Sequence, residues 1–241
     1  MAMPCILAIE TSSHIGAVAI LRGQRCEDVL ASESVRDDQK LSAWVLPAVE
    51  RVIAAAEITH AAIDAIAFGA GPGSFTGVRT ACATAQSLAY AWQRPLVTVD
   101  SLDALAESAT AATVCVVLDA RMREVFSATF ARQANGALLR LTPTTVCTPD
   151  AVVMPANSEL IGSGVNLLPV PQNAALAATA HAEANWANGV ARVAARKLAR
   201  GETTDPLHAE PIYVRNNVAL TEVERLQARV AGLPPARENV A

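Results

Sequence analysis

Ile6-Leu-Ala-Ile-Glu10 and Cys115-Val-Val-Leu-Asp119 are two apolar segments of strand length, and each of them ends in an acidic residue. Each is followed by turn-forming residues and then by two further strand-like segments, at 17–22 and 24–34 in the first half and at 125–130 and 138–147 in the second. One order of elements that occurs twice along a chain indicates an internal duplication. The two segments therefore predict two related lobes, each built around a β-sheet.

Helical periodicity accompanies these strands in both halves of the chain. Apolar residues recur at intervals of three and four in the segments 37–57, 75–93, 101–107 and 182–200. Further apolar runs of strand length lie at 63–68, 96–99 and 160–162. Strands interspersed with helices are typical of an α/β fold, so we predict two lobes, residues 1–110 and 111–241, each a mixed sheet covered by helices. The duplicated unit resembles the actin-like ATPase (ASKHA) fold, a likeness that by itself assigns no function.

The composition argues against several classes of protein. With 52% hydrophobic and 17% charged residues, the chain is too apolar to be disordered. Its net charge of −4 and the lack of a basic face argue against autonomous binding of nucleic acid. No run approaches the roughly 20 apolar residues of a membrane span, and the first apolar segment has no basic start. We therefore expect a cytoplasmic protein without membrane contact.

Metal ligands are not arranged in the usual patterns. The five cysteines form no C-x-x-C pair, and no two of the four histidines stand three or four residues apart. Structural and catalytic zinc sites usually show such spacings, so we expect no metal site and reduced, buried thiols. The cations Arg192, Arg196, Lys197 and Arg200 form the one basic cluster, which is either a solvated face or a contact with nucleic acid.

The stretch Gly69-Ala-Gly-Pro-Gly-Ser-Phe-Thr-Gly-Val-Arg79 precedes a predicted helix and is rich in glycine. Free amide groups at the start of a helix can bind an anion, so one interpretation is a phosphate-contacting loop. The other interpretation is a tight turn from strand to helix, capped by Ser74 or Thr76. Neither a P-loop nor a dinucleotide fingerprint is present. The candidate residues of an anion or nucleotide loop are Gly71, Gly73, Ser74, Thr76, Gly77 and Arg79.

Glu10 and Asp119 each end the first strand of a repeat. In an actin-like fold, acids at such positions can hold a metal ion or orient a water molecule. The alternative is that each carboxylate caps a turn by accepting backbone hydrogen bonds. A kinase of this fold would also need a second phosphate loop, for which residues 162–164 are the one short candidate.

Two predicted helices, 37–57 and 76–93, carry apolar or small residues on more than one side. A helix of this kind is either buried on both faces or lies at a subunit interface, because large exposed apolar patches usually contact a partner.

Four motifs stand in the same order as in the bacterial TsaB (YeaZ) family, which the chain resembles over nearly its whole length. They are Ile6-Leu-Ala-Ile-Glu-Thr11, Gly71-Pro-Gly-Ser-Phe-Thr-Gly-Val-Arg79, Asp119-Ala-Arg-Met122 and Ala209-Glu-Pro-Ile-Tyr-Val-Arg-Asn-Asn217. The resemblance implies a degenerate relative of the catalytic subunit TsaD, needed for attaching a threonylcarbamoyl group to N6 of adenosine 37 in tRNAs that read codons beginning with A.

The resemblance also implies partners. Family members pair with TsaD, the ATPase TsaE joins the pair, and TsaC supplies the threonylcarbamoyl-adenylate. Without TsaD they tend to form homodimers through helices of the N-terminal lobe. The resemblance therefore favours a position at a subunit interface for six residues of the two helices: Trp44, Val45, Thr80, Thr84, Ser87 and Leu88. We expect no tightly bound cofactor, ATP or ADP only in the complex, and tRNA contact only through the complex.

The resemblance favours a scaffold without catalysis of its own, and the sequence supports this. TsaD-like catalysts carry an H-x-x-x-H pair on their first long helix, whereas residues 37–44 contain no histidine. The alternative is an ATP-dependent small-molecule kinase that uses Glu10, Asp119 and the glycine-rich loop. A protease acting on TsaD is a third hypothesis, for which no nucleophile and base are visible.

Overall fold

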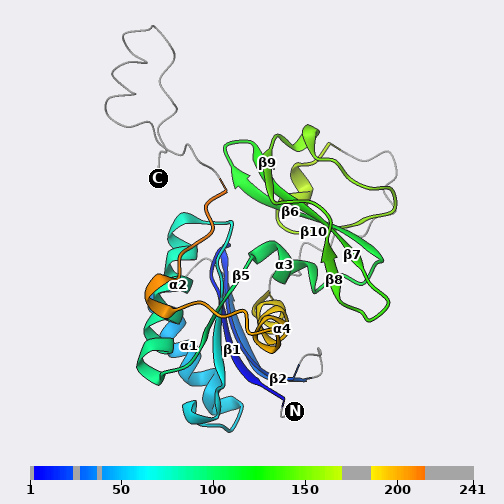
Figure 1. The fold of residues 1–241 in the computed structure, drawn as a ribbon. Helices are drawn as coiled ribbons and strands as arrows, with labels where there is room; N and C mark the ends of the chain where they lie inside the picture. Colours follow the sequence, from blue (N-terminus) through cyan, green and yellow to red (C-terminus); the bar gives the residue numbers. More distant parts are fainter. Residues whose placement is uncertain (1–2, 24–27, 37–39, 170–185, 215–241) are drawn as a thin grey trace, which may run out of the picture.

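The computed structural model describes residues 3–23, 28–36, 40–169 and 186–214. Its strands form two five-stranded sheets, one in each half of the chain (Figure 1). The first half contains β1 (Cys5–Glu10), β2 (Ile15–Arg22), β3 (Val29–Arg36), α1 (Leu41–Ala55), β4 (Ala65–Gly69), α2 (Phe75–Trp92), β5 (Leu96–Val99) and α3 (Ser101–Ala106). The second contains β6 (Thr113–Arg121), β7 (Glu124–Arg132), β8 (Leu138–Arg140), β9 (Thr145–Cys147), β10 (Glu159–Ile161) and α4 (Trp186–Ala199).

The two sheets share the arrangement of their central strands, in agreement with the predicted repeat, whereas β5 has no counterpart among the described strands of the second sheet. The first sheet has the order β3-β2-β1-β4-β5, and the second has β10-β6-β7-β8 with β9 also paired to β7. In the first, β1 is antiparallel to β2 and parallel to β4. In the second, β6 is likewise antiparallel to β7 and parallel to β10. The chain therefore has an α/β fold with two mixed sheets.

Helices cover both faces of the first sheet, and this explains why every residue of β1 is buried. Figure 1 shows α1 and α2 side by side on one face and α4 on the other. Buried positions of α1 and α2 recur every three or four residues, as the periodicity predicted. A strand covered on both faces reads as a continuous apolar run, in agreement with Cys5-Ile-Leu-Ala-Ile9.

The helix α4 departs from the expected division of the chain. It lies within residues 111–241, which we assigned to the second lobe, yet it packs against β1, β2 and α3 of the first half. Small residues permit the close approach, since a Cβ atom at Gly189 would collide with the backbone of Ala104. Residues 182–185 of the expected helix lie outside the described residues, as do 37–39 of the first helix and 24–27 of the third strand.

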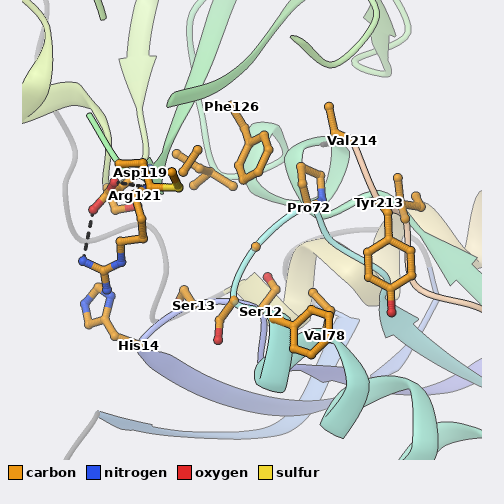
Figure 2. Close-up of a pocket in the computed structure, with 18 of the residues that line it drawn as sticks. Ser12, Ser13, His14, Pro72, Val78, Asp119, Arg121, Phe126, Tyr213 and Val214 are labelled. Atoms are coloured by element: carbon orange, nitrogen blue, oxygen red, sulfur yellow. Dashed lines mark hydrogen bonds and ion pairs between the residues drawn. The ribbon is translucent and has the colours of Figure 1, made fainter. Parts of the chain in front are cut away.

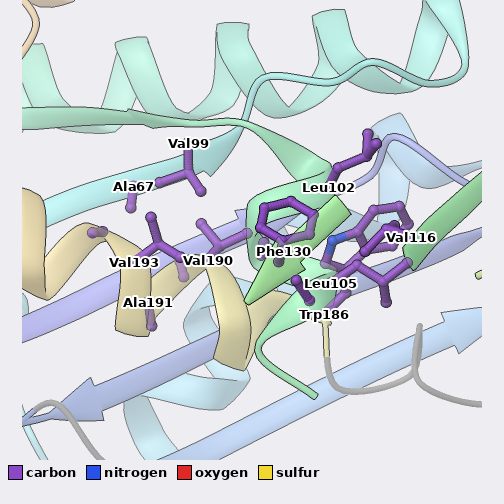
Figure 3. Packing of buried hydrophobic residues seen from close by; sticks show 14 of the residues in the cluster. Ala67, Val99, Leu102, Leu105, Val116, Phe130, Trp186, Val190, Ala191 and Val193 are labelled. Carbon is purple, nitrogen blue, oxygen red and sulfur yellow. The ribbon is translucent and has the colours of Figure 1, made fainter. Parts of the chain in front are cut away.

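The largest core cluster joins the two sheets through α3 and α4. Val99 of the first sheet and Val116 and Phe130 of the second belong to this one cluster, and Figure 3 shows them within it. Trp186 belongs to this cluster, and its indole nitrogen donates a hydrogen bond of 2.7 Å to the carbonyl oxygen of Ser101. The halves of the chain are thus connected by a shared apolar core.

Among the described helices, none combines the length and apolar composition that crossing a bilayer requires.

Candidate functional site

A cavity of about 720 Å³ lies where the two repeats face each other. One wall is the turn Ser12–His14 after β1, and its counterpart is the end of β6 with Asp119 and Arg121 (Figure 2). The glycine-rich loop before α2 and the segment Ile212–Val214 complete the wall near α2. Its aromatic lining residues are Phe75, Phe126, Trp186 and Tyr213.

The glycines of the loop are explained by close packing of backbone on backbone. A Cβ atom at Gly73 would collide with the carbonyl oxygen of Ser12, and one at Gly77 with that of Thr11. The Ser74 amide donates a hydrogen bond of 2.6 Å to the Ser12 carbonyl oxygen, which fixes the loop against the turn after β1. This geometry favours the interpretation of a tight turn, although Gly73 and Ser74 also line the cavity.

The start of α2 is capped by Ser74. Its hydroxyl accepts a hydrogen bond of 3.4 Å from the Gly77 amide, as an N-cap serine does. Thr76 lies inside the helix, and its carbonyl oxygen accepts from the Thr80 hydroxyl at 2.9 Å. Gly71 precedes this turn with a left-handed φ of 96°, and Arg79 lies within α2.

Glu10 does not line the cavity. Its carboxylate is completely buried, where one oxygen accepts from the Ser12 amide and the other from the Ser101 hydroxyl, both at 2.7 Å. Burial raises the pKa of Glu10 above its ordinary value, opposed by these hydrogen bonds. This position favours the alternative of a turn-stabilising carboxylate over a metal-holding or water-orienting acid in the cavity. The physical reason is that all its partners come from its own lobe.

Asp119 does line the cavity, but its carboxylate is hydrogen-bonded and ion-paired to Arg121. One oxygen accepts from the backbone amide of Arg121 at 2.7 Å, and the other lies 3.2 Å from the guanidinium of Arg121. The same turn holds Arg121, Met122 and Arg123 at left-handed φ values of 61°, 56° and 63°, which are uncommon outside glycine. Figure 2 shows the Arg121 side chain extending toward His14 across the mouth of the cavity.

The two acids thus occupy different environments, and the structure does not bring them together at the cavity. Within the described ranges, no group of three or more His, Cys, Asp and Glu side chains is placed to hold a metal ion. Residues 162–164 contribute Ser163, whose hydroxyl accepts from the Asp119 amide at 3.3 Å. A Cβ atom at Gly162 or Gly164 would meet the backbone of β6, so these glycines also serve close packing.

The expected interface residues separate into two groups. Trp44 and Val45 are buried against the first sheet, 6% and 1% exposed, so their assignment to an interface is wrong. The indole of Trp44 occupies the space left by Gly16, and its nitrogen donates to Glu33 at 3.1 Å. On α2, Thr80, Thr84 and Leu88 are half-buried and Ser87 is exposed.

Several side chains near these positions are exposed although the sequence did not predict it. Leu46 on α1 is 50% exposed, and Phe75 and Tyr90 on α2 are 58% and 69% exposed. Tyr213 of the C-terminal segment is 50% exposed and stands beside Phe75. Helical periodicity places apolar residues on a stripe that faces the core. Leu46 and Tyr90 fall outside that stripe, and this was the feature of the sequence that could have predicted their exposure.

The basic cluster of α4 serves the fold. Arg192 is buried and forms an ion pair with Glu107, and Arg196 pairs with the same carboxylate. The Lys197 ammonium donates to the Thr98 carbonyl oxygen at 2.8 Å, and Arg200 pairs with Glu202. These bonds within the chain favour a structural role for the cluster over a contact with tRNA.

Two of the sequence motifs meet in space. The amide of Ile212 donates to the Ala70 carbonyl oxygen at 2.7 Å, and Gln86 of α2 donates to the carbonyl oxygens of Pro206 and Ala209. The C-terminal segment therefore runs along α2 to the glycine-rich loop (Figure 1). Residues 215–217 of this motif lie outside the described residues.

Comparison with known proteins agrees with these motifs. The model of the TsaD family, tRNA N6-adenosine threonylcarbamoyltransferase, matches residues 37–199. The chain is 29% identical to the tRNA threonylcarbamoyladenosine biosynthesis protein TsaB of Escherichia coli K12, over 89% of this chain and 96% of that protein. It is 33% identical to the protein of the same name from Haemophilus influenzae, over 53% and 54%.

The same likeness extends to a solved structure. YeaZ from Pseudomonas aeruginosa superimposes with a TM-score of 0.72 at 30% sequence identity, and the match covers 88% of this chain and 100% of that one. The sequence match to TsaB and the structural match to YeaZ each cover almost nine tenths of this chain. The chain belongs to the TsaB (YeaZ) family.

Proposed function

We propose that this chain is a non-catalytic scaffold and activating subunit in the formation of threonylcarbamoyladenosine at position 37 of tRNAs that read codons beginning with A. In this proposal it binds the catalytic subunit TsaD, the ATPase TsaE joins the pair, and TsaC supplies the threonylcarbamoyl-adenylate. Without TsaD the chain forms a homodimer, and it contacts tRNA only within the complex, in the cytoplasm. The support for this pathway is that two relatives are named as tRNA threonylcarbamoyladenosine biosynthesis proteins.

The outward face of α2 is the observation that carries the scaffold role. From Thr80 to Trp92 the helix contains no charged residue. Ala83, Ser87, Tyr90 and Ala91 are nevertheless exposed on it. Leu46 of the neighbouring α1 is half-exposed as well. A helix surface without charge favours a protein partner over solvent, because burying it would desolvate no ion.

The cavity supports the non-catalytic part of the proposal. A kinase of the duplicated actin-like fold would use its two strand-end acids on a bound nucleotide and metal. Here Glu10 is enclosed by the protein and Asp119 is paired with Arg121. We therefore propose that the chain alone binds no nucleotide tightly, with ATP or ADP restricted to the complex. The kinase alternative has no comparable supporting observation.

Light scattering on a sizing column tests the scaffold role, with the chain alone and mixed with TsaD from the same source. We expect a dimer that exchanges into a one-to-one complex. Ser87→Trp places bulk on the exposed face of α2 and should weaken both assemblies. Ser34→Trp on β3, which is also exposed, is the matched control and should leave both intact. A chain that remains unchanged in the presence of TsaD would overturn the proposal.

A further inference from the structure

Arg79 is the one charged residue of α2, and two aromatic rings hold its side chain. Its guanidinium carbon lies 3.7 Å from the centroid of the Phe75 ring and 5.9 Å from that of Tyr213. Its Nε donates a hydrogen bond of 3.1 Å to the Tyr213 hydroxyl. The two rings are 6.4 Å apart, one on α2 and the other on the C-terminal segment. This trio is called the Arg79 cluster below.

The geometry leaves the outer edge of the guanidinium unused. Only Nε is hydrogen-bonded among the described residues, and no described carboxylate forms an ion pair with Arg79. A guanidinium offers parallel N–H groups that match the two oxygens of a carboxylate. Stacking and the Nε bond restrict the side chain before binding, which lowers the entropy lost when a partner is bound.

The surroundings of the cluster favour a protein carboxylate over a phosphate backbone. Phe75 and Tyr213 are 58% and 50% exposed, and arginine and large aromatic residues are enriched where protein partners bind most strongly. Nucleic acid is usually held by several cations along its backbone, whereas α2 has this single one. The cluster is also continuous with the uncharged face of α2, which begins one residue later at Thr80.

We propose that the Arg79 cluster receives an Asp or Glu side chain of the partner protein, which Arg79 binds through its two terminal nitrogens while Phe75 and Tyr213 pack around it. The proposal rests on the scaffold function and specifies how the TsaD-family partner is recognised. Arg79 thereby sets the position of the partner at the end of α2 nearest the cavity.

Equilibrium binding of TsaD from the same source, measured by titration calorimetry, tests the proposal. Arg79→Ala should weaken binding by about 10- to 100-fold, because the partner carboxylate would then be buried without a counter-charge. Arg79→Lys should lose most of the same affinity, since an ammonium keeps the charge but not the paired N–H groups. Arg200→Ala is the control, since that exposed arginine pairs with Glu202 and should not affect binding.

The outcomes distinguish a failure of this proposal from a failure of the scaffold function. If the unsubstituted chain fails to bind TsaD, both are wrong. If it binds and Arg79→Ala binds equally tightly, the scaffold function stands and the role of Arg79 is wrong. If Arg79→Ala leaves TsaD binding unchanged but weakens tRNA binding by the assembled complex, the cluster contacts phosphate, and the carboxylate proposal is overturned. Thermal melting of each variant verifies that the exposed substitution leaves the fold intact.

Discussion

The carboxylate of Glu10 and the hydroxyl of Ser101 are joined by a buried hydrogen bond of 2.7 Å, from the end of β1 to the first residue of α3. The same hydroxyl accepts from the Gly71 amide at 3.1 Å. One carboxylate and one hydroxyl thus connect the first strand, the glycine-rich loop and the helix that leads to the second half. The acid at the end of β1 therefore connects three elements of the first half of the chain.

Stability should depend on pH through Glu10, and Glu10→Gln should remove that dependence. Burial raises the pKa of Glu10 in the folded protein above the ordinary value of 4.5. The folded state then binds more protons than the unfolded state, so the stability from this group is complete below about 4.5 and is lost as pH rises through the folded pKa. The free energy of unfolding of the parent, relative to Glu10→Gln, should fall over that window in urea titrations.

Glu33→Gln provides a control of opposite sign. The hydrogen bond from Arg51 lowers the pKa of Glu33, so its contribution is present above its ordinary pKa and is lost as pH falls through the folded value. Equal pH profiles for the parent and Glu10→Gln would show that the buried carboxylate does not titrate in this range and would contradict the prediction.

Gly77→Ala should destabilise the first lobe by about 3 kcal/mol, because the new Cβ atom would collide with the backbone carbonyl of Thr11. Backbone cannot move aside as a flexible side chain can. Gly136→Ala is the matched control: it has open space around its Cβ position and a φ of 81°, so it should lose only about 1 kcal/mol from backbone strain. Chemical denaturation measures both; similar losses at the two positions would refute the packing argument.

Glu107→Gln should destabilise the chain by about 3 kcal/mol, because it leaves the buried guanidinium of Arg192 and that of Arg196 without their shared carboxylate. The substitution preserves shape, so the loss reports charge pairing between α3 and α4. Glu202→Gln removes the exposed partner of Arg200 and should have little effect. A Glu107→Gln melting curve that coincides with that of the parent would mean that the pair adds no net stability.

Nucleotide should not bind the isolated chain. Equilibrium dialysis with labelled ATP or ADP and Mg²⁺ is expected to give no saturable binding, because Asp119 is paired with Arg121 and Glu10 lies outside the cavity. Asp119→Asn should therefore leave assembly with TsaD unchanged. Saturable binding of ATP that Asp119→Asn abolishes would instead support the kinase alternative.

Local patterns were sufficient for most of the secondary structure. The apolar run that ends at Glu10 predicted the strand β1, and glycines before a capping serine gave the turn into α2 as one interpretation. Such patterns depend on residues close in sequence, whose spacing reports strand or helix directly. The absence of charge along α2 was equally visible in the sequence, but not which of its uncharged residues would be exposed.

The sequence by itself determined the order of strands and helices, the repeat and the family motifs, because each is carried by neighbouring residues. Only the tertiary structure decided that α4 packs on the first sheet, that Trp44 turns inward over Gly16, and that Arg79 meets Tyr213. Periodicity predicts that a helix has an apolar face, but it does not predict which other element of the fold will cover that face. That choice depends on contacts between residues far apart in the chain, where the shapes of two separate elements must fit.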